Sequence, residues 1–240
     1  MRPARAPSAA KTLSMRLRST GVGGGPPCPT SEGGGSAWIR VWPTVTCRRR
    51  ARSVLGNGPA AVGRHFKHHR VPVVKNQSIA AYDPRSIQGM GVTYATSPMG
   101  ADHTAGNVID KNLDSLGGSL NPLKAEGQVE VSREYQIDVA AFDCTGLCLF
   151  ANSAVNTNPK AGEALLTIIN AKFGTRLTAA DKRALGIRVL KAEREFNRKA
   201  GLTNADDRLA RFFYEEPLPP HNTVVVVSDE EMDSTFGDPL

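Results

Sequence analysis

Two cysteines lie four positions apart in the segment FDCTGLCLF, residues 142–150. Thiolates bind soft metals and iron–sulfur clusters, so Cys144 and Cys148 could bind one centre together. The same spacing suits a pair in which one sulfur binds and the other packs as a small apolar side chain. Asp143 could accept hydrogen bonds from N–H groups, and Gly146 would let a ligand approach the backbone closely. The spacing alone leaves a metal site and a packed pair both open.

A histidine with possible proton-transfer chemistry lies in GVTYATSPMGADHTAGN, residues 91–107. The imidazole of His103 titrates near neutral pH, so it could accept or donate a proton. Its neighbour Asp102 cannot easily orient the ring, whereas backbone groups of the glycine-rich turn could. A histidine that only satisfies structural hydrogen bonds is the alternative interpretation.

A second group of histidines has the spacing of a helical zinc site. His65 and His69 are four residues apart in HFKHH, and two such histidines can bind zinc from one face of a helix. However, Lys67 and Arg70 oppose a cation, and no Glu lies between the histidines as a base. The segment is therefore interpreted as a solvated basic turn.

The elements that must position these residues are predicted to be mainly α-helical. Apolar spacing and end signals predict helical segments at about 59–66, 105–116, 125–142, 159–173 and 179–200, and an extended run at 224–227. Pro159 suits a first helical position and Gly174 a stop, while Thr178 and Asp181 form a capping-box pattern. Most of 53–103 is interpreted as loop, with YDPRS and GMG as turns.

Charge and composition divide the chain into two regions. The first fifty residues contain nine Lys or Arg and one acid, Glu32, a net charge of +8, and the remainder carries −1, which together give the formal +7. The remainder is nearly neutral, which argues against nucleic-acid binding. No apolar run reaches the roughly eighteen residues of a membrane span. Residues 1–52 are expected to be a disordered or spurious leader, although their Arg- and Ser-rich composition also resembles a transit peptide. Residues 53–240 are expected to form the helical region.

Five motifs occur in order along this region: YDPR, GMGVTYATSPMGADHTAG, DCTGLC, EREFNRKAGLTNADDRL and EEPLPPHN. Together they closely resemble the carboxyl-terminal part of the aldehyde ferredoxin oxidoreductases, which are tungsten-pterin enzymes. The resemblance covers about residues 55–240. It implies a multihelical carboxyl-terminal fold and the oxidation of aldehydes to carboxylic acids, with ferredoxin as electron acceptor. Only four cysteines in the chain also indicate a reducing, cytoplasmic location.

The resemblance assigns roles to individual residues. It implies that Asp143 hydrogen-bonds a pterin and that Leu147 and Leu149 line the same cofactor, a tungsten-bis-pterin of the molybdopterin type. Cys148 would be the last ligand of a [4Fe–4S] cluster and would touch the pterin, which makes Cys144 the packing cysteine. His103 would lie beside the metal and relay protons.

Several family features are absent from the sequence. These are three cluster cysteines at C-x2-C-x3-C spacing, the earlier pterin motif D-x-x-G-L-D and the amino-terminal sheet domain. The chain alone is therefore expected to be inactive and to bind neither tungsten nor a complete cluster. A partner chain would supply the amino-terminal half. The alternative is a non-catalytic helical interaction module, or an inactive truncated product, that retains the family's packing residues. The preferred aldehyde, the oligomeric state and the choice of tungsten or molybdenum stay open.

Overall fold

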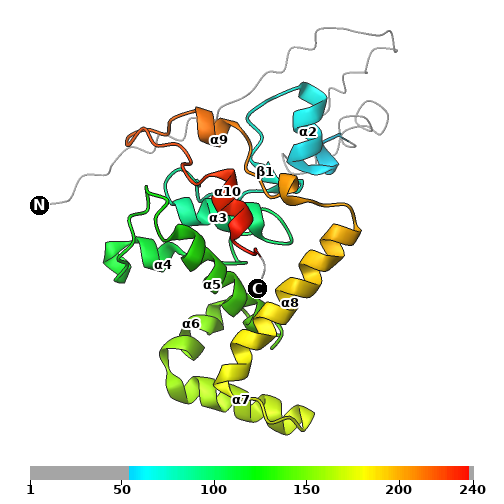
Figure 1. Ribbon diagram of the computed structural model, residues 1–240, viewed down its shortest axis with the longest axis vertical. Coiled ribbons are helices and arrows are strands. Elements are labelled where there is room, and N and C mark those ends of the chain that lie inside the picture. Colours follow the sequence, from blue (N-terminus) through cyan, green and yellow to red (C-terminus); the bar gives the residue numbers. More distant parts are fainter. Residues whose placement is uncertain (1–53, 238–240) are drawn as a thin grey trace, which may run out of the picture. The chain divides into compact units, whose positions relative to one another are not determined.

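The computed structural model describes residues 54–237, which belong to one compact unit, Arg49–Leu240 (Figure 1). The expected leader, 1–52, lies outside the described residues. The α-helices are α2 (Gly58–Phe66), α3 (Gln88–Thr96), α4 (Ile109–Asn112), α5 (Gln128–Asp143), α6 (Phe150–Thr157), α7 (Pro159–Phe173), α8 (Ala179–Lys199), α9 (Phe212–Glu215) and α10 (Asp229–Ser234). Two 3-10 turns, η2 (Asp114–Leu116) and η3 (Asn204–Asp206), and one hairpin, β1 (Val73–Val74) with β2 (Gln77–Ser78), complete the described elements. The prediction of a mainly helical fold is confirmed.

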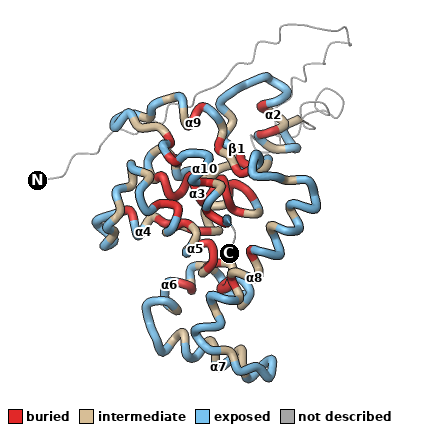
Figure 2. The backbone as a smooth tube through the Cα atoms, viewed as in Figure 1, coloured by how far each residue is buried: buried red, intermediate tan, exposed pale blue. Residues whose placement is uncertain are grey.

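The centre of the core is α3, a helix that the sequence analysis did not predict. All nine of its residues are buried (Figure 2). A helix buried on every side has no polar face, so the amphipathic signal that identifies surface helices is missing. The interpretation of GMG, residues 89–91, as a turn is therefore wrong.

Glycine is needed in α3 because neighbouring elements approach its backbone closely. A Cβ atom added at Gly89 would lie 2.4 Å from Oε1 of Gln128 and 2.8 Å from a methyl carbon of Val108. Removing the side chain lets α5 and the segment before α4 pack directly against the helix. The two glycines that weaken helix propensity in α3 thus permit its burial.

The longest two helices, α5 and α8, pack against each other (Figure 1). A Cβ atom at Gly186 in α8 would lie only 2.0 Å from the carbonyl oxygen of Ile137 in α5. Leu190 and Ile137 are buried in the same small apolar cluster. Gly186 therefore sets how closely the two helices approach.

Helix ends agree well with the sequence signals. Pro159 is the first residue of α7, and Gly174 follows the helix in a left-handed conformation with φ of 64°. Thr178 and Asp181 form the predicted capping box at the start of α8. The helical segment expected at 105–116 is instead divided into α4 and η2, because Leu113 between them is extended.

The extended run at 224–227 is present but does not pair as a strand. The amide side chain of Gln88 donates to the carbonyl of Val224 and accepts from the N–H of Val226, both at 2.9 Å. Val225 and Val227 are buried, whereas Val226 is half exposed. A buried side chain thus satisfies the backbone groups that a neighbouring strand would satisfy in a sheet.

Replacing Gly186 should weaken the contact between α5 and α8. Gly186→Ala places a methyl group against the Ile137 carbonyl, and we expect a loss of about 1–3 kcal/mol in unfolding free energy. The matched control is Gly162→Ala in α7, where the nearest atom to an added Cβ is 3.5 Å away. Urea denaturation followed by circular dichroism measures both variants. Equal midpoints for the two would contradict the close approach.

Candidate active-site face

The predicted proton-transfer residue, His103, lies in the turn that follows α3. Its side chain is about one-third exposed, at 36%, and its ring lies 5.3 Å from the ring of Tyr82 between centroids. The closest carboxylate oxygen, Oδ1 of Asp102, is 3.9 Å from Nδ1, which is too far for a hydrogen bond. Asp102 accepts instead from the backbone N–H and hydroxyl of Thr104. The expectation that Asp102 would not orient the ring directly agrees with this geometry.

The end of α3, immediately before this turn, is bound by a buried lysine. Lys75 occupies a left-handed position in the β1–β2 hairpin, and its side chain is only 6% exposed. Its ammonium group donates to the carbonyls of Ala95 and Ser97, at 2.8 and 3.1 Å, and pairs with Asp207 at 2.5 Å. Burial lowers the pKa of Lys75, while Asp207 opposes that change. All three N–H donors of the ammonium group are therefore used.

Two residues of α8 bind the carbonyls that Lys75 does not reach. Arg194 donates to the carbonyl of Thr96 and to Asp207, both at 3.2 Å. Asn197 donates to the carbonyl of Pro98 at 2.8 Å. Four consecutive carbonyls, 95–98, are thus bound by side chains from elsewhere in the chain, and we call Lys75, Arg194 and Asn197 the carbonyl clamp. Sequence reasoning missed the clamp, because no local pattern connects a hairpin lysine to residues more than a hundred positions away.

The predicted cofactor residues lie in the motif turn, residues 143–149, between α5 and α6. Asp143 is the last residue of α5, and Gly146 has the left-handed φ of 73° that the turn requires. Asp143, Leu147 and Cys148 are exposed, and Leu149 is half-buried. Cys144, expected to pack, is also exposed, and its thiol donates to the carbonyl of Ala140 at 3.2 Å.

Asp102, Asp143 and Glu193, three carboxylates on different elements, are linked by electrostatic interactions, and we call the surface that carries them the acidic face. Partial burial and the negative charge of Asp102 raise the pKa of Asp143. Burial and Asp143 in turn raise the pKa of Glu193 in α8. Asp143 is therefore within electrostatic range of Asp102, the neighbour of His103, which relates the motif turn to the turn after α3. The sequence analysis missed Glu193, for which no motif gives a signal.

Asp138 fixes the helices on either side of the motif turn. Its carboxylate, in α5, accepts from the side chains of Asn152 and Asn156 in α6 and pairs with Lys182 in α8. Burial opposes ionisation, but these three donors outweigh it and lower the pKa of Asp138. One carboxylate thus links three helices and holds the two ends of the turn in place.

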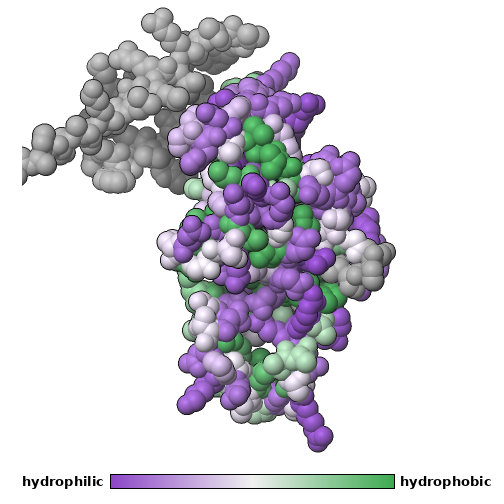
Figure 3. Space-filling model, turned by 60° about the vertical axis from the view of Figure 1, so that its left-hand side comes forward, coloured by the Kyte–Doolittle hydropathy of each residue, from purple (hydrophilic) through white to green (hydrophobic). Residues whose placement is uncertain are grey.

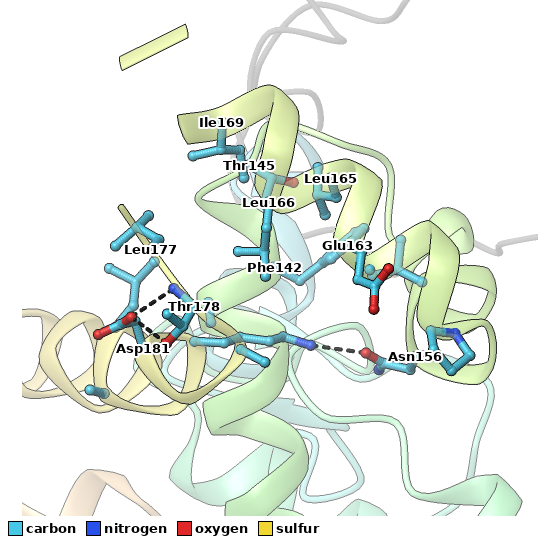
Figure 4. Close-up of a pocket in the computed structure, with 18 of the residues that line it drawn as sticks. Phe142, Thr145, Asn156, Glu163, Leu165, Leu166, Ile169, Leu177, Thr178 and Asp181 are labelled. Atoms are coloured by element: carbon cyan, nitrogen blue, oxygen red, sulfur yellow. Dashed lines mark hydrogen bonds between the residues drawn. The ribbon is translucent and has the colours of Figure 1, made fainter. Parts of the chain in front are cut away.

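A pocket of about 670 Å³ lies behind the motif turn, between α5, α6, α7 and α8 (Figure 4). Phe142, Leu165, Leu166, Ile169 and Leu177 form its mainly apolar wall. At its edge, Asp181 accepts two hydrogen bonds from Thr178, and Lys182 donates to Asn156. The pocket borders the motif turn through Phe142 and Thr145.

Apolar side chains also reach the surface near the motif turn and on α7. Phe150, directly after the turn, is 95% exposed, and Ile168 and Phe173 of α7 are mostly exposed. Figure 3 shows apolar surface among polar residues at the end of the molecule where α7 lies. None of the residues of α7 is buried within the described part of the chain. Several exposed apolar side chains on a folded protein are typical of a surface that contacts another molecule.

The histidines at 65 and 69 do not share a helical face. Lys67 adopts a left-handed conformation that ends α2, so His69 lies beyond the helix that contains His65. His69 forms a hydrogen bond with Glu216 at 3.0 Å, and Arg70 pairs with the same carboxylate. Glu216 therefore neutralises part of the predicted basic turn.

The motif turn suits one edge of a cofactor site. Within residues 54–237, no hydrogen bond engages the carboxylate of Asp143, which leaves it able to accept from a ligand N–H group, and the Cys148 thiol is exposed beside it. No group of three or more His, Cys, Asp or Glu in this part of the chain could hold a metal ion. Asp143 and Cys148 thus offer one available carboxylate and one exposed thiol, fewer donors than the four ligands of a [4Fe–4S] cluster. No helix in the same residues combines the length and apolar character needed to cross a bilayer.

Comparison with known proteins gives matches over most of this region. A family model described as aldehyde ferredoxin oxidoreductase, domains 2 and 3, matches residues 24–236. A tungsten-containing aldehyde ferredoxin oxidoreductase of Pyrococcus furiosus is 31% identical over 168 residues, which are 69% of this chain and 27% of that protein. The protein of the same name from Thermococcus kodakarensis is 32% identical over 178 residues, 73% of this chain and 29% of its own length. The chain thus spans less than a third of these relatives.

Removing the charge of Asp143 should stabilise the chain at neutral pH. The folded state raises the pKa of this carboxyl, so its charged form is disfavoured once the pH has risen through the folded pKa. Asp143→Asn should raise the urea midpoint at about pH 7 and have no effect near pH 3, where both states are protonated. Asp181→Asn is the matched control of opposite sign, because hydrogen bonds from Thr178 lower the pKa of Asp181. Its loss of stability at pH 7 should shrink as the pH falls. A pH-independent effect of Asp143→Asn would contradict the acidic face.

Proposed function

This chain belongs to the aldehyde ferredoxin oxidoreductase family, and we propose that it forms the cofactor-facing, carboxyl-terminal part of an enzyme that oxidises aldehydes to carboxylic acids. The supporting observation is the electrostatic interaction between Asp143 of the motif turn and Asp102, the neighbour of His103. Ferredoxin is the proposed electron acceptor, and the cytoplasm is the proposed location, in keeping with the few cysteines of the chain.

The proposed site residues divide the work by their chemistry. Asp143 would hold a pterin by accepting hydrogen bonds, Leu147 and Leu149 would cover it, and Cys148 would bind the iron–sulfur cluster as a thiolate. When bound, the tungsten-bis-pterin and the [4Fe–4S] cluster would supply the two-electron redox chemistry that side chains lack.

His103 is proposed as the proton acceptor for the reaction. Conversion of an aldehyde and water into a carboxylic acid releases two electrons and two protons. The imidazole has a ring nitrogen that can accept a proton, and its side chain is partly exposed. It can therefore take one of the protons and release it to solvent.

The rest of the cofactor site would come from polypeptide outside this sequence. Cys148 provides one thiolate, whereas a [4Fe–4S] cluster takes four ligands. The exposed Phe150 and Leu147 beside it give a second chain or domain apolar surface to cover. The proposal is a partner chain with the missing cysteines, which would dock on this face.

Replacing Cys148 tests the proposed cluster ligand. In a complex reconstituted with an amino-terminal half that carries C-x2-C-x3-C, Cys148→Ala should abolish uptake of the cluster, measured as bound iron and visible absorbance. Cys144→Ala is the matched control, since this thiol donates to a carbonyl of its own helix, and should retain cluster and turnover. A viologen-coupled aldehyde assay measures activity. Full iron content in Cys148→Ala, or complete cofactor and turnover in the chain alone, would contradict the assignment.

A change at His103 tests the proton transfer separately. His103→Gln in the reconstituted enzyme should lower turnover by about 10²-fold or more, because the loss of a general base typically costs that much. Tungsten and iron content should stay unchanged. The control is His221→Gln, a histidine at the edge of a different pocket. Equal turnover of wild type and His103→Gln would rule out a proton-transfer role. A chain that accepts no partner and shows no turnover in any form would favour the non-catalytic module.

A further inference from the structure

We propose that the carbonyl clamp, held together by Asp207, positions the imidazole of His103. Its catalytic consequence rests on the proposed function, whereas its structural consequence does not. Within residues 54–237, the His103 ring forms no hydrogen bond; its Nδ1 lies 3.9 Å from Oδ1 of Asp102, and its centroid lies 5.3 Å from that of Tyr82. The position of the imidazole therefore depends on the backbone of its turn, from which the side chain projects.

The clamp acts on the last residues before that turn. The carbonyls of residues 95–98 close α3 and lead directly into the turn, and each is bound by Lys75, Arg194 or Asn197. Carbonyls at the end of a helix carry partial negative charge and have few partners within the helix. A buried lysine and a partly buried arginine there provide both hydrogen bonds and charge complementarity.

Asp207 makes the two cations compatible at this site. Lys75 and Arg194 repel each other, and their charges meet at the same buried carboxylate, which pairs with the lysine on one oxygen and the arginine on the other. The buried carboxylate of Asp207, in the segment after η3, thus binds the hairpin through Lys75 and α8 through Arg194. Changing any one member leaves a buried charge or carbonyl without its partner.

Close packing between the hairpin and the turn extends the effect of the clamp towards His103. Gly100 has φ of 99°, and a Cβ atom there would lie 2.6 Å from the carbonyl oxygen of Val74, the residue before Lys75. The N–H of Gly100 donates to Ser97, whose carbonyl also accepts from Lys75. The hairpin therefore contacts the turn three residues before His103, and a displaced hairpin would displace the imidazole.

The test uses the full 240-residue chain with isotope-labelled histidine. Lys75→Met keeps the length of the side chain but removes its charge and donors. NMR should show the ring signals of His103 shifted or broadened, while those of His221 keep their positions. Lys199→Met is the control, since it removes an exposed lysine that pairs with Glu195 on the same helix. It should leave His103 unchanged.

A milder variant keeps the proposal testable if Lys75→Met does not fold. Asn197→Ala removes one partly exposed donor from the clamp, and it should shift the His103 signals in the same direction by a smaller amount. Arg194→Lys keeps the charge and should perturb the signals less than Arg194→Met. Unchanged His103 signals in a folded Lys75→Met or Asn197→Ala chain would overturn the proposal.

An activity measurement separates this proposal from the enzymatic one. In the reconstituted enzyme, Lys75→Met should lose turnover by about tenfold to a hundredfold, as expected for a misplaced catalytic group, with cluster content unchanged. Wild type without turnover would refute the proposed function and leave the NMR result decisive for positioning. Active wild type with an equally active Lys75→Met variant would refute positioning alone.

Discussion

The fold depends on charged side chains that donate hydrogen bonds to the last carbonyls of α3. A helix buried on all sides cannot leave its last carbonyls to water, and an unpaired buried carbonyl costs free energy comparable to a lost hydrogen bond. Lys75 and Arg194, neutralised in part by Asp207, satisfy them here. The same contacts connect the hairpin, α3 and α8, so burial of the core helix and placement of the following turn have one physical cause.

The surface around the motif turn, unlike the core, carries groups that are unfavourable in water. Partial burial and the charge of Asp102 raise the pKa of Asp143, and burial and the charge of Asp143 raise the pKa of Glu193. Leu147 in the motif turn and Phe150 directly after it expose apolar side chains. Both features are unfavourable in water and favourable against a surface that supplies donors and apolar area. They fit a family in which the relatives are more than three times as long as the matched segment.

Local sequence signals predicted the outer helices well. Pro159, Gly174 and the Thr178–Asp181 capping box act within one turn of the backbone, and the structure contains each of them as expected. The same reasoning failed for α3, because tertiary packing on every side replaces the amphipathic pattern and turns glycine from a helix breaker into a packing requirement. The prediction of one helix at 105–116 was wrong because Leu113 adopts an extended conformation, which no residue near it in sequence predicts.

The sequence by itself determined the family motifs, the residues with reactive side chains and the ends of the long helices, since these depend on residues close together in the chain. Only the tertiary structure decided which of those residues meet. The proximity of Asp143 to Asp102 and the pairing of Lys75 with Asp207 join positions that are far apart in sequence. Such contacts follow from the packing of α3, α5 and α8, and packing depends on the shapes of all the side chains together.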